Sequence, residues 1–272
     1  MSGNSREYDL VVIGGGAGGL SVASGAAGLG ARVALVERKH ALGGDCLFHG
    51  CVPSKALIEA GRLAWRARRA EMFGLRIPQV EVDFQGVMAH VHDKIARVGE
   101  HDNVERFERM GVDVHFGEGR FTGTHEFELG GEMLRGRKFA VATGAGPRIP
   151  PIPGLEDVDY LTNVNVFDLK ELPRSLVVLG GGPIGVELGQ AFSRLGTEVT
   201  ILESTDFLLR RDDHELCEIL MDAFRAEGIR LVLGHRAESV SRSEDGMIEV
   251  RAASPDGTQT LRGERLLVGL GR

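Results

Sequence analysis

Cys46 and Cys51 stand five residues apart, and Lys55 follows four residues after the second cysteine. The next segment, ALIEAGRLAWRARRAEMFG (residues 56–74), has a helical pattern of apolar residues. A thiolate near a helix N-terminus is stabilised by the helix dipole, which lowers its pKa and raises its reactivity. The spacing by itself fits a redox-active pair and two buried structural cysteines equally well. A zinc site is disfavoured, because no second pair of ligands with suitable spacing is apparent.

An internal repeat indicates the elements that would position such a pair. Residues 9–37, DLVVIGGGAGGLSVASGAAGLGARVALVE, align with residues 175–203, SLVVLGGGPIGVELGQAFSRLGTEVTILE, at a single offset of 166 residues. Each copy holds an apolar run, a glycine-rich turn, a helix-length segment, a second apolar run and a terminal glutamate. This order is typical of the β–turn–α–β unit that binds a mononucleotide.

The three glycines of each turn have separate physical tasks. The first permits the tight turn, the second lets a pyrophosphate approach the backbone, and the third lets the helix pack closely on the strand. The terminal carboxylate can accept hydrogen bonds from a ribose diol. These residues are Gly14, Gly16, Gly19 and Glu37 in the first copy and Gly180, Gly182, Gly185 and Glu203 in the second. Two copies in register predict two nucleotide sites.

Composition excludes several other classes of protein. The 272 residues favour two domains, and 42% hydrophobic with 26% charged residues exclude a disordered chain. The net charge of −7 argues against nucleic acid or an anionic membrane as the main partner. Three cysteines do not make an extracellular disulfide framework, and the N-terminal MSGNSREYD lacks the order of a signal peptide. We therefore expect a cytoplasmic protein without a membrane span.

The whole redox segment, GGDCLFHGCVPSK at residues 43–55, resembles the motif of the class I pyridine nucleotide-disulfide oxidoreductases, the flavoprotein disulfide reductases. Further landmarks of this resemblance are VATG at 141–144, GGGPIGVE at 180–187 and VGLGR at 268–272. The resemblance covers essentially the entire chain. It extends to both mercuric reductase-like and dihydrolipoamide dehydrogenase-like members without choosing between them.

The resemblance implies an α/β protein of two Rossmann-like three-layer nucleotide-binding domains, the FAD/NAD(P)-binding fold. Residues 1–150 are expected to form the FAD-binding domain, with a helical stretch at 55–110. Residues 151–272 are expected to form the NAD(P)-binding domain. Short strands near 113–141 are expected to form a small meander within the first domain.

FAD is the cofactor that the resemblance assigns to the first domain. Its pyrophosphate would lie at the first glycine-rich turn, and its adenosine ribose on Glu37. The further FAD contacts implied in this way are Asp45, Cys46, Lys55, Gly119, Thr143, Gly144 and Ala145.

The second domain would bind NAD(P)H. The contacts implied there are Gly180, Gly182, Ile184, Gly185, Glu187, Glu203 and Gly271. Glu203 predicts that NADH is preferred over NADPH, because a carboxylate binds a free 2′-hydroxyl and repels a 2′-phosphate. No metal site is expected.

The implied catalytic residues are Cys46, Cys51, Lys55 and Glu187. Cys51 would be the flavin-side sulfur of a Cys46–Cys51 disulfide, and Cys46 would exchange with the acceptor. Lys55 and Glu187 would pair beside the flavin ring. Reducing equivalents would then pass from NAD(P)H through FAD and the disulfide to a small-molecule disulfide, a metal ion or a quinone.

Family members continue beyond the point that matches Arg272 with a return segment of the FAD domain and a dimerisation domain. That last domain supplies a His–Glu acid/base pair and the homodimer contact. We therefore interpret the chain as truncated and expect no complete turnover from it alone. Two alternatives remain: a non-catalytic nucleotide-binding or redox-sensing protein, and a flavin-dependent NADH oxidase that bypasses the disulfide.

Overall fold

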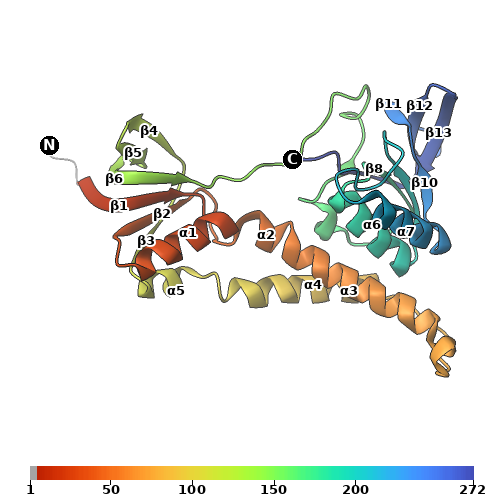
Figure 1. The fold of residues 1–272 in the computed structure, drawn as a ribbon, viewed down its shortest axis with the longest axis horizontal. Coiled ribbons are helices and arrows are strands. Elements are labelled where there is room, and N and C mark those ends of the chain that lie inside the picture. Colours follow the sequence, from red (N-terminus) through yellow and green to blue (C-terminus); the bar gives the residue numbers. More distant parts are fainter. Residues whose placement is uncertain (1–4) are drawn as a thin grey trace. The chain divides into compact units, whose positions relative to one another are not determined.

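The structure, a computed structural model, describes residues 5–272 (Figure 1). Contacts divide the chain into two compact units. The first holds residues 5–53 with Asp93–Ala145, and the second holds Ser54–His92 with Gly146–Arg272. The signal-peptide interpretation rests partly on residues 1–4, which lie outside the described residues.

A six-stranded sheet of order β3-β2-β1-β6-β5-β4 forms the base of the first unit. Its strands are β1 (Ser5–Ile13), β2 (Val33–Glu37), β3 (Val112–Phe116), β4 (Gly119–Gly123), β5 (Glu126–Leu129) and β6 (Glu132–Val141). Strands β3, β2, β1 and β6 run parallel, and β4 and β5 extend the sheet in antiparallel pairing from β6. The predicted meander therefore exists in β4 to β6. It was wrong for residues 112–116, because the helices before β3 return the chain in the parallel direction, so that Val112 pairs with Val33.

Alternation along the strands separates two apolar cores, one on each face of this sheet. Val12, with Leu20 and Leu35, belongs to the core beneath α1 (Ala17–Gly28) and α5 (Val104–Arg109). Val11 lies on the other face, in a core with Phe127 of the meander. Strand β2 is buried along its whole length, as expected for a strand with parallel neighbours on both sides.

The helical stretch expected at 55–110 is confirmed. It contains α3 (Cys51–Arg68), the short 3-10 helix η1 (Ala70–Phe73), α4 (Phe84–Gly99) and α5. A further short helix, α2 (Gly44–Phe48), comes immediately before α3. Asn103 begins α5 as its N-cap and accepts a hydrogen bond of 2.8 Å from the Arg106 N–H.

The second unit carries a five-stranded parallel sheet of order β10-β9-β8-β14-β7 and a separate antiparallel sheet β11-β12-β13. The strands of the parallel sheet are β7 (Tyr160–Leu161), β8 (Ser175–Leu179), β9 (Glu198–Leu202), β10 (Arg230–Val232) and β14 (Arg265–Val268). Those of the antiparallel sheet are β11 (Arg236–Arg242), β12 (Ile248–Ser254) and β13 (Gly257–Gly263). The 3-10 helix η2 (Val166–Asp168) lies between β7 and β8 in the chain.

Helices α6 (Pro183–Leu195) and α7 (His214–Ala226) belong to the parallel sheet, and α6 packs on β8 and β9. Pro183 occupies the start of α6, where its missing N–H has no intrahelical partner to lose, and Gly196 ends the helix with φ +123°. A core that joins Val177 to Val240 and Val250 packs the antiparallel sheet against the parallel one. Both units are thus α/β structures built on parallel strands, which confirms the expected fold class.

Candidate functional site

The glycine-rich turn after β1 depends on contacts that only glycine can make. Gly14 has φ +109°, and a Cβ on it would overlap the Ala142 carbonyl oxygen. A Cβ on Gly19 would overlap the carbonyl oxygen of Gly14. Gly16 is the N-cap of α1, and the described residues supply neither a capping side chain nor an acidic residue to the first turn of that helix. The positive end of α1 is therefore available to an anion, which fits a bound pyrophosphate.

The turn after β8 repeats this geometry in the second unit. Gly180 has φ +104°, and a Cβ on Gly185 would overlap the carbonyl oxygen of Gly180. Gly182 is the N-cap of α6, whose first turn again holds no acid within residues 183–186. Ile184 is half-buried beside it on the first turn. Both glycine-rich turns thus have the shape that the sequence repeat predicted.

Each repeat ends in a glutamate that binds the turn of its own unit. Oε2 of Glu37 accepts the Gly15 N–H at 2.7 Å, and Oε2 of Glu203 accepts the Gly181 N–H at 2.8 Å. Burial opposes the ionisation of Glu203, but hydrogen bonds from Gly181, Thr205 and Ser204 outweigh it and hold its pKa below the usual range. The sequence did not indicate this second role of the glutamate. Its carboxylate fixes the middle glycine of the GGG run, Gly15 or Gly181, before any ribose binds.

The redox segment begins directly on the first turn. Gly16 and Gly43 form a backbone bridge, and a Cβ on Gly44 would lie 2.5 Å from the Gly16 Cα. Gly44 is the first residue of α2, which carries Asp45 and Cys46, and α3 then starts at Cys51. The backbone that would bind a pyrophosphate is therefore in contact with the start of the helix that carries Cys46.

Cys46 and Cys51 lie side by side as thiols, and no disulfide joins them in residues 5–272. The hydrogen bond between the two sulfurs is the largest cause that raises the pKa of Cys46, and burial adds to it. The expected lowering of the pKa by a helix dipole was therefore wrong for Cys46. Its helix has only five residues, so its dipole is small, whereas the neighbouring sulfur is in contact.

Lys55 and Glu187 are brought together within the second unit. Nζ of Lys55 lies 2.6 Å from Oε1 and 2.7 Å from Oε2 of Glu187, and 60% of the lysine side chain is exposed. The helices that carry them, α3 and α6, cross closely at Gly61, where a Cβ would lie 2.9 Å from the Ala191 carbonyl oxygen. The pairing predicted from the sequence is present, on the surface of the unit.

Thr143, Gly144 and Ala145 follow β6 and are exposed. The Ala142 N–H donates to the Ile13 carbonyl at 2.8 Å, so this segment leaves the sheet beside the first glycine-rich turn. A Cβ on Gly14 would lie 3.1 Å from the Thr143 Cα. These three residues therefore lie at the carboxyl edge of β1, where ligands of parallel α/β sheets bind.

Two predicted contacts have a local structural explanation. Gly119 begins β4, and a Cβ there would lie 2.6 Å from the Glu128 carbonyl and would overlap the Phe127 ring. Gly271 has φ +108°, and its carbonyl accepts the Arg148 N–H at 2.9 Å. Their roles as FAD and nucleotide contacts remain predictions.

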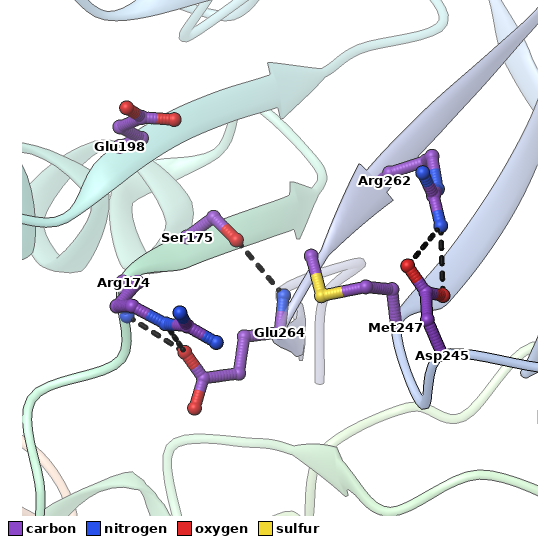
Figure 2. A pocket seen from close by; sticks show the side chains of 7 residues that line it. All are labelled: Arg174, Ser175, Glu198, Asp245, Met247, Arg262 and Glu264. Atoms are coloured by element: carbon purple, nitrogen blue, oxygen red, sulfur yellow. Dashed lines mark hydrogen bonds and ion pairs between the residues drawn. The ribbon is translucent and has the colours of Figure 1, made fainter. Parts of the chain in front are cut away.

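A cavity of about 310 Å³ lies in the second unit (Figure 2). It is at the opposite edge of the parallel sheet from the glycine-rich turn after β8. Ser175 and Glu198 line it from the first residues of β8 and β9, whereas Gly180 and Glu203 follow the last residues of the same strands. Ligands of parallel α/β sheets bind at the carboxyl ends of the strands, so this cavity is not at the predicted nucleotide site.

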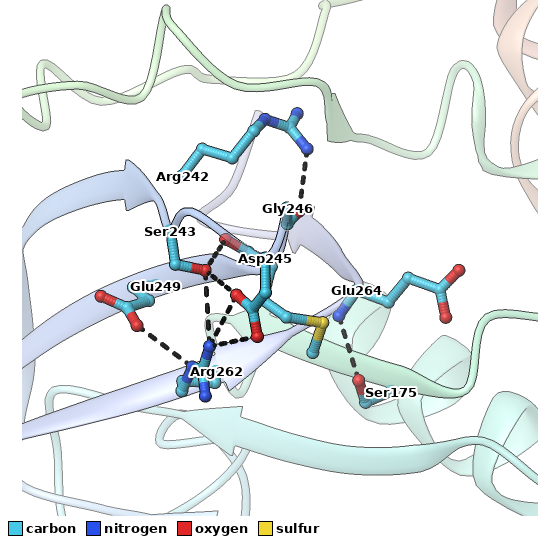
Figure 3. A network of polar contacts seen from close by, with 9 residues as sticks. Ser175, Arg242, Ser243, Asp245, Gly246, Glu249, Arg262 and Glu264 are labelled. Carbon is cyan, nitrogen blue, oxygen red and sulfur yellow. Dashed lines mark hydrogen bonds and ion pairs between the residues drawn. The ribbon is translucent and has the colours of Figure 1, made fainter.

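Polar contacts in that cavity hold the antiparallel sheet in place (Figure 3). Arg262 donates to both carboxylate oxygens of Asp245 at 2.8 Å and lies 3.1 Å from Glu249. Hydrogen bonds from Ser243 and Arg262 hold the pKa of Asp245 below its usual range. Arg262 of β13 is thus paired with the turn between β11 and β12 and with β12 itself, so the network explains sheet structure and offers no reacting group.

Within residues 5–272, no group of three or more histidine, cysteine, aspartate or glutamate side chains is arranged to hold a metal ion. No helix in the same range is long and apolar enough to cross a membrane.

Comparisons with known proteins agree with this geometry. Residues 8–272 match the family described as "Pyridine nucleotide-disulphide oxidoreductase". The chain is 36% identical over 267 residues to a mercuric reductase of Bacillus cereus, covering 98% of this chain and 42% of that protein. It is 34% identical over 290 residues to a dihydrolipoyl dehydrogenase of Bacillus subtilis (strain 168), covering 98% and 59%. The chain thus spans about half the length of these curated relatives.

A solved structure shows the same likeness. The Cu(II) complex of the HOCl-induced flavoprotein disulfide reductase RclA from Escherichia coli superposes with a TM-score of 0.82 and 28% identity. The likeness covers 98% of this chain and 57% of that one. The family match over residues 8–272, together with the two glycine-rich turns and the cysteine pair, shows that this chain belongs to the pyridine nucleotide-disulphide oxidoreductase family.

Proposed function

We propose that this chain is the FAD- and NAD(H)-binding part of a disulfide oxidoreductase whose redox-active pair is Cys46 and Cys51. The contact of Gly16 with Gly43 and Gly44 carries the proposal, because it puts the start of the cysteine helix on the turn that fits a pyrophosphate. A cytoplasmic location is part of it, because a reducing compartment suits a catalytic cysteine pair.

The first unit offers FAD a place that its backbone has already shaped. The proposed contacts are Gly14, Gly16, Gly19, Glu37, Asp45, Cys46, Lys55, Gly119, Thr143, Gly144 and Ala145. The uncapped first turn of α1 supplies N–H donors to phosphate oxygens. Bound FAD would supply the two-electron chemistry that no side chain of the protein provides, receiving a hydride from nicotinamide and returning the electrons to sulfur.

The cysteine pair would receive those electrons. Reduction of the Cys46–Cys51 disulfide breaks the S–S bond, takes up two electrons and two protons, and leaves the two thiols. Because the contact with Cys51 raises the pKa of Cys46, the structure favours Cys46 as the sulfur that keeps its proton. Cys51 would then accept the hydrogen bond as the flavin-side sulfur of this proposal.

Lys55 would supply positive charge on the same helix as Cys51, one helical turn further along. Glu187 holds the ammonium group with both carboxylate oxygens, which fixes the direction of a long and flexible side chain. We propose that this pair stabilises negative charge on reduced flavin.

The acceptor in this proposal is a small disulfide or a soft metal ion. A disulfide reacts with a dithiol by thiol–disulfide exchange, and soft metals bind thiolate. Relatives of this chain are named mercuric reductase and dihydrolipoyl dehydrogenase, which supports both classes of acceptor.

In the second unit we propose that Gly180, Gly182, Ile184, Gly185, Glu187, Glu203 and Gly271 bind NADH in preference to NADPH. The ionised carboxylate of Glu203 would attract a ribose diol and repel a 2′-phosphate. We expect a difference of ~1–3 kcal/mol between the two nucleotides, the scale of one charged hydrogen bond. Parallel titrations at one ionic strength measure it, and equal affinities would contradict the preference.

Anaerobic reduction of the FAD-loaded chain tests the main proposal. NADH should bleach the flavin, and thiol titration should then find two more reactive sulfhydryls than in the oxidised sample. The Cys51→Ser variant should be bleached without that gain and should lack thiolate–flavin charge-transfer absorption, whereas Cys217→Ser should behave as the unmodified chain. Bleaching without new thiols in the unmodified chain would favour the NADH oxidase alternative. Failure of NADH to bleach bound flavin would favour the redox sensor.

A further inference from the structure

The carboxylate of Glu203 accepts more hydrogen bonds from the protein than the carboxylate of Glu37, its counterpart in the first repeat, does. Oε2 accepts the Gly181 N–H at 2.8 Å, and Oε1 accepts the Thr205 N–H at 2.9 Å. Oε1 also accepts the hydroxyl groups of Ser204 and Thr205, each at 3.1 Å. Each carboxylate oxygen has about two lone-pair sites, so the three donors on Oε1 fill that oxygen, whereas Oε2 keeps one site open.

Glu37 sits in the same place in the first repeat but lacks the hydroxyl donors. It accepts the Gly15 N–H at 2.7 Å and the Lys39 N–H at 2.8 Å, the two backbone bonds that correspond to those on Glu203. At the offset of 166 residues, Arg38 and Lys39 stand where the second repeat has Ser204 and Thr205. The extra donors are therefore a property of the second site and not of the fold.

The two kinds of donor on Glu203 differ in whether they can leave. The two N–H groups are fixed in the backbone, whereas both hydroxyls can rotate. Ser204 is exposed, so its hydroxyl can donate to water in place of Glu203. The Thr205 hydroxyl also lies 3.0 Å from the Phe207 carbonyl oxygen, a second acceptor already within reach. A ligand hydroxyl that binds Oε1 can therefore displace one of these two groups, at the cost of the hydrogen bond that it breaks.

We infer that Ser204 and Thr205 occupy the position of a ribose hydroxyl on Oε1 of Glu203 and compete there with the adenosine ribose of NADH. They are specificity-determining residues of the nucleotide site. They keep Oε1 satisfied while the site is empty, and one of them rotates away when a ribose hydroxyl arrives. This inference rests on the proposed binding of NADH at Glu203. It concerns ligands with a free diol, because a 2′-phosphate cannot donate to the carboxylate.

Binding of ADP-ribose to the FAD-loaded chain of 272 residues, measured by calorimetry, tests this inference without any turnover. Ser204→Ala and Thr205→Val remove one competing donor each and leave both backbone hydrogen bonds in place. Each should tighten ADP-ribose binding about three- to tenfold, the scale of one net hydrogen bond. Affinity for 2′-phospho-ADP-ribose should change less than affinity for ADP-ribose, since only its 3′-hydroxyl can still donate to the carboxylate and its 2′-phosphate is repelled.

Matched controls separate competition from a general effect on the fold. Thr205→Ser keeps the hydroxyl and should bind as the unmodified chain does. Ser241→Ala and Thr258→Val make the same changes on exposed strand positions of the antiparallel sheet and should also leave binding unchanged.

The outcomes distinguish the inference from the function on which it rests. If the unmodified chain binds ADP-ribose and the two variants bind it equally or more weakly, the hydroxyls orient Glu203 and the inference is overturned. If the unmodified chain binds 2′-phospho-ADP-ribose as tightly as ADP-ribose, the proposed NADH preference itself fails. Tighter diol binding by both variants, with the controls unchanged, supports the inference.

Discussion

The substitution Gly19→Ala provides a direct measure of the close approach of α1 to the strand. A Cβ at this position would overlap the carbonyl oxygen of Gly14, lie 3.0 Å from the Gly14 carbonyl carbon and lie 3.3 Å from Cγ1 of Val12. The nearest neighbour is backbone, so no side chain can rotate to relieve the overlap. Forcing one carbon into such a contact costs about 1–3 kcal/mol.

Gly25→Ala is the matched control in the same helix. Gly25 is exposed in the last turn of α1, and a Cβ there would meet no atom within 4 Å. Both variants gain about 0.5–1 kcal/mol of helix propensity, so their difference isolates the steric cost. We expect Gly25→Ala to stabilise the protein and Gly19→Ala to be about 1–3 kcal/mol less stable than Gly25→Ala.

Urea unfolding followed by far-UV circular dichroism measures this difference, provided that the slope m is the same for both variants. The melting temperature should report it independently, at about 2–4 °C per kcal/mol for a chain of this size. Equal stabilities of the two variants would refute the reasoning. The close contact between helix and strand would then not be the reason for a glycine at position 19.

Three further predictions concern the cysteine pair, the ion pair between α6 and the residue after α7, and the acid limit of stability. Cys51→Ala should make Cys46 react faster with iodoacetamide at neutral pH, because it removes the largest cause of the raised pKa of Cys46. Glu227→Ala should cost about 3 kcal/mol in urea unfolding, because it leaves the nearly buried guanidinium of Arg194, now 2.6 Å from Glu227, without its carboxylate. The pKa of Glu203 is lowered by folding, so its stabilisation is complete above the ordinary value of 4.5 and is lost as pH falls through the folded value. Glu203→Gln should therefore show a shallower loss of stability in acid than the unmodified chain.

Matched variants make these three outcomes informative. Cys217→Ser should leave the alkylation profile of Cys46 unchanged, because Cys217 is buried at 2% exposure among apolar residues. Glu128→Ala breaks the exposed Arg120–Glu128 pair and should cost less than about 1 kcal/mol. An unchanged Cys46 rate in Cys51→Ala, equal costs for the two ion pairs, or identical acid profiles would each contradict the corresponding argument.

The internal repeat allowed most of the nucleotide-binding geometry to be predicted from the sequence. It also extends further than the four motif positions of each copy. Leu42 and Leu208 correspond at the offset of 166 residues. Leu42 packs against Gly15, and Leu208 packs against Gly181. Gly43 and Leu209 correspond too, and each N–H donates to the carbonyl of the same glycine at 2.8 Å. Leu209 has φ +51°, the only positive φ of a non-glycine residue within 5–272. A longer alignment of the two copies would have revealed these residues.

Other features depend on neighbours that lie far apart in the sequence. The direction of β3 follows from the helical crossover before it, which strand patterning does not report. The pKa of Cys46 is set by contact with Cys51 and by burial, and local helix periodicity predicts neither of them. The four donors on Glu203 could be suspected from Ser204 and Thr205, but their convergence on one carboxylate required the turn and the strand end together.

The strand order of the second unit also determines when its sheet can be completed. β7 has β14 as its neighbour, yet about a hundred residues separate them in the chain. β14, the last strand of the sheet to be synthesised, must insert between β8 and β7. Such pairing has high contact order, so the loop-closure entropy is lost before the pairing stabilises the sheet. Until β14 inserts, the facing edges of β8 and β7 remain open to other strands, so these two edges expose the nascent second unit to misassembly.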